Sequence, residues 1–183
     1  QLMSASRLST ATGTDVDTFI ADFGLTRLAA ISSTGAVTLS RTTTTQAATI
    51  PAGTQIQTSD GTQTFLVVAD TAQASWNAGL NAYTIAIGTA SIAATVQAIN
   101  AGTQGNISAN TLTVITQPIQ GVQTVNNALA FANGVDAETD AAVKIRFALF
   151  VAGIRAGIKS AVDSAIANLQ QGIQHATVEN YAY

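Results

Sequence analysis

The chain has 183 residues, of which 47% are hydrophobic and 9% are charged, and its formal net charge is −3. A packed core is expected, although the charged fraction lies far below the roughly 25% of an average soluble domain. The seven basic residues form no stripe that could neutralise several phosphates, which argues against a nucleic-acid partner. Without cysteine, the chain has neither disulfides nor Cys–zinc sites.

The apolar runs are shorter than the roughly 18–20 residues that a membrane span needs. The longest, residues 147–154, stops at Arg155, so we expect no membrane partner. Because the chain starts at Gln1 and stops abruptly at Tyr183, we expect a piece of a longer protein with a truncated last domain.

The first predicted element is a helix over residues 14–23. Thr14 is expected to be its N-cap, with Asp17 completing a capping box and Asp15 also at the positive end of the helix dipole. Gly24 is expected to end the helix with a left-handed backbone, and Leu25 to fold back on the helix. The apolar stripe has helical spacing and consists of Val16, Phe19, Ile20 and Phe23.

Residues 31–130 are predicted to be β-rich. Val37, Leu39 and Arg41 alternate with polar residues, as in a half-buried strand. Asp60-Gly61 predicts a hairpin between strands at 55–58 and 62–68. Turns are expected at Pro51-Ala52-Gly53 and at Gly105-Asn106, and a polar loop around Trp76. Further strands are predicted at 83–87, 91–99, 111–115 and 122–125.

Residues 136–183 return to a helical pattern. Val143, Phe147, Phe150, Val151 and Ile154 form one broad apolar face, whereas Ile145 and Leu149 point elsewhere. Because a surface helix needs only one apolar face, the second one predicts contact with another partner. A second helix is predicted over 161–170 and a strand over 173–181.

These elements predict an α+β chain with an antiparallel β-rich middle domain, either a sandwich or a partly closed barrel. The expected division is an N-terminal helical segment at 1–30, a β-rich domain at 31–130 and a C-terminal helix–strand unit at 131–183.

The order of the motifs identifies a family. The chain resembles the baseplate J-like proteins of contractile phage tails over nearly its whole length, with residues 134–140 as the most specific part. The matching motifs are Thr12-Gly13-Thr14-Asp15-Val16-Asp17, Phe23-Gly24-Leu25, Arg27, Val37-Thr38-Leu39-Ser40-Arg41, Ile50-Pro51-Ala52-Gly53-Thr54, Asp60-Gly61, Gly105-Asn106, Val125-Asn126-Asn127, Gly134-Val135-Asp136-Ala137-Glu138-Thr139-Asp140 and Arg146.

The resemblance implies a structural subunit of the baseplate wedge, in the virion of a phage or in a related contractile injection system. Its expected partners are copies of itself and other wedge and hub proteins, joined in a ring around the central hub. The protein is expected to be made in the bacterial host cytoplasm and to act without catalytic residues, metal, cofactor or small-molecule substrate.

A structural or assembly role is expected for the motif residues and for two aromatic residues of the last helix. They are Gly13, Asp15, Gly24, Arg27, Arg41, Pro51, Gly53, Gly61, Gly105, Asn106, Gly134, Asp136, Glu138, Asp140, Arg146, Phe147 and Phe150.

Other interpretations stay open. A receptor-binding or adhesive module would share the Thr-rich β character, and a polysaccharide-degrading tail enzyme would need paired carboxylates in a cleft. Asp136, Glu138 and Asp140 fit a metal or acid–base site, but they fit a helix start better, with Asp140 pairing with Lys144.

Three further features are ambiguous. His175 is more consistent with packing than with catalysis. The basic residues Lys144, Arg146, Arg155 and Lys159 favour a solvated helix face over a patch for an acidic partner. The Trp76 ring is equally consistent with a partner anchor and with packing over the end of the barrel.

Overall fold

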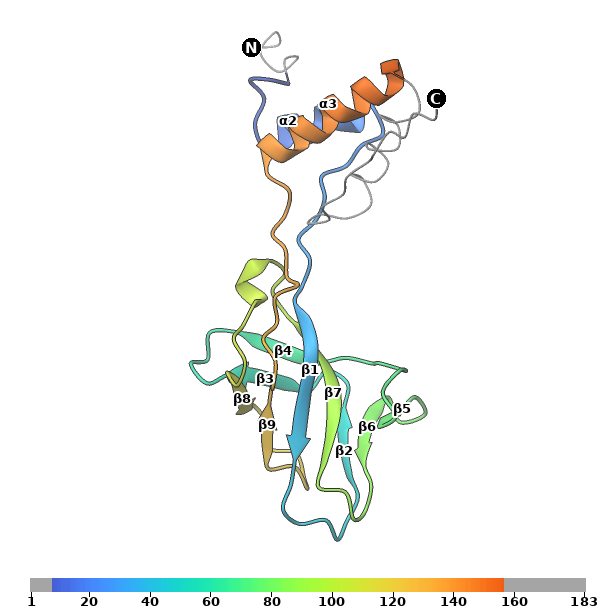
Figure 1. Cartoon of the computed structure of the whole chain (residues 1–183), viewed down its shortest axis with the longest axis vertical. Helices are drawn as coiled ribbons and strands as arrows, with labels where there is room; N and C mark the ends of the chain where they lie inside the picture. Colours follow the sequence, from blue (N-terminus) through green and yellow to red (C-terminus); the bar gives the residue numbers. More distant parts are fainter. Residues whose placement is uncertain (1–7, 157–183) are drawn as a thin grey trace, which may run out of the picture. The chain divides into compact units, whose positions relative to one another are not determined.

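The computed structural model describes residues 8–156. Contacts divide the chain into two compact units: Ile31–Asp136 forms the barrel unit, and Gln1–Ala30 with Ala137–Tyr183 forms the helical unit. Figure 1 shows the strands of the barrel unit and the helices of the helical unit. The elements expected over 161–170 and 173–181, together with Lys159 and His175, lie outside the described residues.

Two antiparallel sheets make up the barrel unit. The larger sheet has the strand order β8-β3-β4-β7-β1-β9, and the smaller has the order β2-β6-β5. The longest ladder joins β1 to β7, and Figure 1 shows these strands side by side. The strands are β1 Thr34–Ser40, β2 Ala48–Pro51, β3 Gln55–Thr58, β4 Thr64–Val67, β5 Trp76–Asn77, β6 Ala82–Ile85, β7 Ser91–Ala98, β8 Leu112–Ile115 and β9 Thr124–Asn126.

Alternating burial explains why these residues form strands. In β1, Val37 and Leu39 are buried while Ala36 and Thr38 are exposed, as the period-two pattern predicts. The buried side chains of both sheets join in one hydrophobic core, so each sheet covers the inner face of the other.

A fully buried tyrosine connects the two sheets. Tyr83 on β6 donates its hydroxyl proton to the Val68 carbonyl at 3.0 Å, and the same oxygen accepts from the Thr95 N–H at 3.1 Å. The Trp76 ring lies edge-on to the Tyr83 ring, with centroids 5.0 Å apart. Trp76 therefore packs on the core beside β6 and is half-buried, as the packing interpretation predicted.

The last gap of the larger sheet, between β8 and β9, is bridged by the side chain of Asn127. Its Oδ1 accepts from the Thr111 and Leu112 N–H groups, and its Nδ2 donates to the Ser108 and Leu129 carbonyls. Asn127 is fully buried, and these bonds occupy each of its amide positions. The result is a nearly closed antiparallel barrel.

The structure confirms the predicted α+β fold class with its antiparallel middle domain. The strand at 55–58 matches β3, and Asp60-Gly61 lies in the hairpin between β3 and β4. Two strands were missed. β2 ends at Pro51, which sequence analysis assigned to a turn, and β5 is a two-residue strand in the region predicted to be a polar loop.

The helical unit contains α2 (Thr14–Ala21) and α3 (Asp140–Ala156), which contact each other. The end of α2 follows the predicted cap. Gly24 has φ 75°, its N–H donates to the Ala21 carbonyl, and the Leu25 N–H donates to the Ile20 carbonyl. This is a Schellman motif, and Leu25 and Ile20 belong to one buried cluster. Within the described part of the chain, neither helix is long and apolar enough to cross a membrane.

The predicted start of α2 was wrong. Gly13, not Thr14, is the N-cap, and no side chain of α2 caps the helix. Asp17 does not complete a capping box, because its carboxylate pairs with Arg27. The Gly13 N–H instead donates to Oδ2 of Asp140 at 2.8 Å, so a carboxylate from α3 takes over the capping role.

Candidate assembly site

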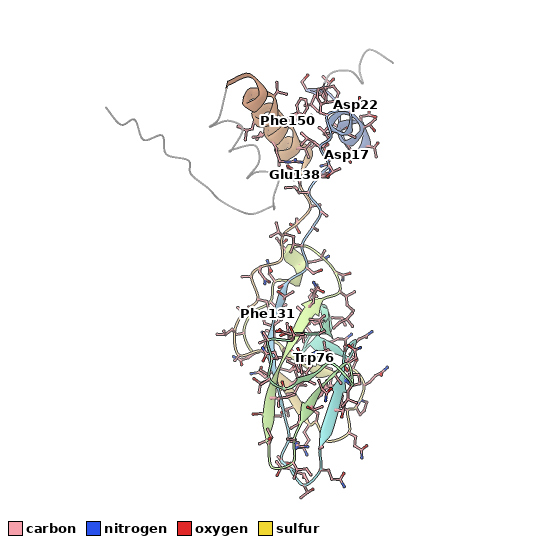
Figure 2. All side chains as sticks on the ribbon, turned by 90° about the vertical axis from the view of Figure 1, so that its right-hand side faces the viewer. Asp17, Asp22, Trp76, Phe131, Glu138 and Phe150 are labelled. Carbon is pink, nitrogen blue, oxygen red and sulfur yellow. The ribbon has the colours of Figure 1, made fainter. Side chains whose placement is uncertain are left out.

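Arg27 connects the two sequence-distant halves of the helical unit. Its guanidinium donates to Oδ1 of Asp17 on α2, to Oδ1 of Asp140 on α3 and to the Glu138 carbonyl, at 2.8, 2.7 and 2.6 Å. Figure 2 shows Asp17 and Glu138 in this region. The hydrogen bond to Asp17, followed by the bond to Asp140, raises the pKa of Arg27, so Arg27 carries its charge at all relevant pH values.

Glu138 and Arg146 form the buried part of the same cluster. The Arg146 guanidinium reaches both Glu138 oxygens, and it also donates to the Thr26 carbonyl at 2.7 Å. Both side chains of the ion pair are almost fully buried. The Glu138 carboxylate also accepts from the Leu28 N–H at 3.1 Å, while the Glu138 N–H donates to the Leu28 carbonyl. Such complete pairing is what allows a charge to stay buried.

Asp140 begins α3, as the helix-start interpretation predicted. The hydrogen bond from the Gly13 N–H, followed by the one from Arg27, lowers the pKa of its carboxyl group. Asp140 therefore stays ionised to a lower pH than an ordinary aspartate and keeps its hydrogen bond from the Gly13 N–H. We refer to Arg27, Asp17, Asp140, Glu138 and Arg146 as the charged cluster.

The three clustered carboxylates of residues 136–140 do not converge on one site. Only Asp140 serves a helix start. Glu138 pairs with Arg146, and Asp136 lies in the other unit, where it accepts from the Thr103 N–H and hydroxyl at 2.7 Å. The helix-start interpretation was therefore wrong for two of the three. Among the described residues, no three His, Asp or Glu side chains are placed to hold a metal ion.

One expectation about the basic residues of α3 was wrong: Arg146 is buried, so it is not part of a solvated face. Lys144 donates to the Ser9 and Ala11 carbonyls at 3.2 and 2.8 Å. Lys144 thereby ties the segment before α2 to α3. The hydrogen bonds of Asp140 come from Gly13 and Arg27, while the charge of Lys144 contributes to the lowered pKa of Asp140. The side chain of Arg155 is not among those that the structure describes.

Arg41 lies buried at the end of β1, on the inward side that its alternation with Val37 and Leu39 indicated. Its guanidinium donates to the backbone carbonyls of Thr89, Gln46 and Ala86 at 2.9, 2.5 and 2.6 Å. These carbonyls come from the loop before β2 and from the loop between β6 and β7. Arg41 therefore fixes the loops at one end of the barrel.

The other motif residues of the barrel unit occupy turns and close contacts. Gly53 and Gly61 have left-handed backbones at φ 86° and 71°, in the turns before β3 and before β4. Gly105 ends the short helix η1 (Thr103–Gly105) and packs against Ala98. Asn106 makes a reciprocal pair with Gly134, donating from Nδ2 to its carbonyl and accepting its N–H at Oδ1. Asp15 is exposed in the first turn of α2.

The outer face of α3 carries apolar side chains in water. Ile145 is 66% exposed and Leu149 is 41% exposed, although Val143 on the same helix is buried against α2. Phe147 and Phe150 are half-buried, and Phe147 packs edge-on against Phe19 and Phe23 of the α2 segment. Figure 2 shows Phe150 on α3. The apolar face is thus anchored on one side and open on the other.

Two grooves of the barrel unit have few ionisable side chains in their linings. One of about 550 Å³ runs between β1 and residues 128–133, and its lining contains no titratable side chain. Another, of about 280 Å³ near the β3–β4 hairpin, has Asp60 as its sole acid. The Asp60 carboxylate is already engaged by the Thr58 and Thr62 hydroxyls.

Most members of the charged cluster lie in the motifs shared with the family, but the pairing of Asp17 with Arg27 was not predicted. Asn127 was not predicted as a site residue either, although this buried asparagine closes the barrel with four amide bonds. The one available signal was the Asn126-Asn127 pair directly after a predicted strand.

The middle unit is thus a nearly closed antiparallel β-barrel, in which Asp60, Asp70 and Asp136 each accept a hydrogen bond from a threonine hydroxyl. Residues 36–134 match the family model described as Baseplate J-like protein barrel domain, which covers more than half of the chain. The chain belongs to the baseplate J-like family. No protein in the curated collection matches it. Family membership gives the chain a structural role in the phage tail baseplate of the virion, among other baseplate proteins.

Proposed function

We propose that the chain is a wedge subunit that assembles, with copies of itself and with other wedge and hub proteins, into the ring around the central hub. The observation that carries this proposal is the open apolar face of α3, with Ile145 and Leu149 in water. Neighbouring apolar side chains exposed on one helix face are typical of a protein–protein contact.

The charged cluster supports this assignment. Arg27 and Arg146 each bind groups contributed from both ends of the chain, so α2 and α3 are held as one rigid pair. A contact surface on rigid elements loses little conformational entropy when a partner binds. In this proposal the helical unit supplies the contacts, and the barrel unit acts as a spacer.

We propose that the protein works by assembly and not by turnover. The support is the dispersal of the acids: Asp60, Asp70 and Asp136 each accept from a neighbouring threonine hydroxyl. Carboxylates held in this way are ionised and spaced apart, whereas glycoside hydrolysis needs two of them flanking one substrate bond. Synthesis in the host cytoplasm, before incorporation into the virion, belongs to the same proposal.

The test is particle assembly with altered outer faces. Ile145→Glu and Leu149→Glu place charges on the open face of α3 without touching the charged cluster. We expect tails that lack a complete baseplate by electron microscopy, and chain that stays in the unassembled fraction. Thr18→Glu, an exposed change on α2, is the matched control and should leave the yield of complete baseplates unchanged.

The outcome against the proposal is also concrete. If both α3 variants are incorporated into intact baseplates at the wild-type level, the open face of α3 is not an assembly contact. Hydrogen exchange of the α2 and α3 amides in each purified variant separates loss of assembly from loss of folding.

A further inference from the structure

Asn133 precedes Gly134, and this is the one Asn-Gly step in the sequence. Asn-Gly is the dipeptide most prone to deamidation, because glycine has no Cβ to hinder attack by its own nitrogen. In that reaction the Gly134 nitrogen forms a bond to Cγ of Asn133, and the Cγ–Nδ2 bond breaks. Ammonia leaves with the proton lost from the Gly134 nitrogen, and water then opens the succinimide to aspartate or isoaspartate.

The fold requires glycine at this position. A Cβ built on Gly134 would lie 2.5 Å from the Gly102 carbonyl oxygen and 3.1 Å from Cβ of Ser33. No side chain fits there without a backbone shift. The labile step is thus a consequence of close packing in the barrel unit.

The Asn133 amide, which carries the electrophilic Cγ, is hydrogen-bonded to the start of β1. Oδ1 of Asn133 accepts from the Thr34 N–H at 2.9 Å and from the Ser33 hydroxyl at 3.1 Å. Its Nδ2 donates to Oγ1 of Thr34 at 2.9 Å. Three bonds to the start of β1 fix the side-chain amide, although Asn133 is exposed to water.

The nucleophile is held as well. The Gly134 N–H donates to Oδ1 of Asn106 at 2.8 Å, and Nδ2 of Asn106 donates back to the Gly134 carbonyl at 3.0 Å. Attack on Cγ requires the Gly134 nitrogen to leave Asn106 and the Asn133 amide to leave Thr34. Both must happen in one opening event.

We propose that Asn133 is a latent modification site, protected while residues 131–136 are docked on β1 and deamidated when they open. Deamidation to aspartate removes the donor to Thr34. Isoaspartate adds a backbone atom next to Gly134, where the Gly102 carbonyl leaves no room. Each opening of residues 131–136 that leads to deamidation would therefore be irreversible, because the modified segment can no longer dock on β1.

The experiment measures deamidation of Asn133 by peptide mass spectrometry, with isoaspartate identified by electron-transfer fragmentation. The samples are the purified 183-residue chain at neutral pH and a synthetic peptide of residues 129–137 as the open reference. We expect the folded chain to react more slowly by at least about tenfold, which corresponds to about 1.4 kcal/mol of opening free energy. Equal rates in chain and peptide would overturn the proposal.

Two variants separate the proposed cause from general burial. Asn106→Ala frees the Gly134 N–H and should accelerate deamidation of Asn133 severalfold, and Ser33→Ala, which removes one bond to Oδ1, should accelerate it less. Asn133→Gln should show no modification at this position. If Asn106→Ala stays folded by circular dichroism and deamidates at the wild-type rate, Asn106 does not protect the site, and the proposed mechanism is wrong. If Asn106→Ala unfolds, the test rests on Ser33→Ala. An unchanged rate of Asn133 deamidation in Ser33→Ala also contradicts the proposal.

Discussion

Arg146 and Glu138 face each other through two short hydrogen bonds, with Nε 2.8 Å from Oε1 and Nη2 2.7 Å from Oε2. The pair is buried, and it fixes the segment that precedes α3 against the segment that follows α2. Removing one partner leaves the other charge buried without compensation, which is among the costliest single changes in a protein.

Glu138→Ala should therefore destabilise the helical unit by about 3–5 kcal/mol. The measurement is hydrogen exchange of the α2 and α3 amides, which reports on this unit separately from the barrel. The double change Glu138→Leu with Arg146→Met removes both charges and should be much less harmful than either single loss. If the double variant loses as much stability as the single variants Glu138→Leu and Arg146→Met lose together, the two side chains do not stabilise each other as an ion pair.

Substitutions at Gly24 test whether its left-handed backbone ends α2. Its φ of 75° suits glycine, and a Cβ there would meet nothing within 4 Å, so any penalty is one of backbone strain and not of collision. Gly24→Val should cost at least about 1 kcal/mol, and Gly24→Asn clearly less, since asparagine tolerates the left-handed region. Urea unfolding of the two variants gives the comparison, and equal losses would refute the cap.

Barrel closure depends on Asn127. Asn127→Ala leaves one buried and one partly buried N–H group and two partly buried carbonyls without their partner, and each unsatisfied buried group costs about 1–3 kcal/mol. We expect a loss of at least about 3 kcal/mol in urea unfolding followed by the fluorescence of Trp76. Asn126→Ala removes a single exposed bond to Asn110 and is the matched control, with little expected change. Similar losses in both variants would show that Asn127 does not close the barrel.

The strands of the barrel could be predicted because their side chains alternate, as Val37 and Leu39 do with their polar neighbours. β2 and β5 could not, since β2 ends in the turn-forming sequence Pro51-Ala52-Gly53 and β5 has two residues. β5 is too short to show a period of two, whereas β2 alternates in burial over its four residues and was missed because of the turn-forming sequence at its end.

The pairings within the charged cluster could not be predicted from local sequence rules, for a different reason. Arg27 and Asp140 are 113 positions apart, and Asp140 caps a helix that begins far earlier in the sequence. Local capping rules predicted Thr14 as the N-cap because they consider only residues next to the helix. An acceptor supplied by another element cannot be recognised from those residues. These residues could be identified from the family motifs, but their partners are seen only in the three-dimensional structure.

Acid should loosen the link between α2 and α3. The pKa of Asp140 is lowered in the folded chain, chiefly by the Gly13 N–H and then by Arg27, so its stabilising effect is complete above the unfolded value of 3.8. That effect is lost as the pH falls from there through the lower folded value. An NMR titration of the Asp140 carboxyl should give a midpoint below 3.8. Arg27→Gln should move that midpoint upward, and an unchanged midpoint would contradict the contact.

The most direct measurement is a cryo-electron microscopy reconstruction of the tail baseplate from the particle that carries this chain. We expect density for the barrel in a ring around the central hub, with Ile145 and Leu149 covered by a neighbouring subunit. A permanent contact of this kind should bury on the order of 2,000 Å² or more, with an apolar centre. The assembly role is wrong if the chain lies outside the baseplate, or if the outer face of α3 touches no other subunit.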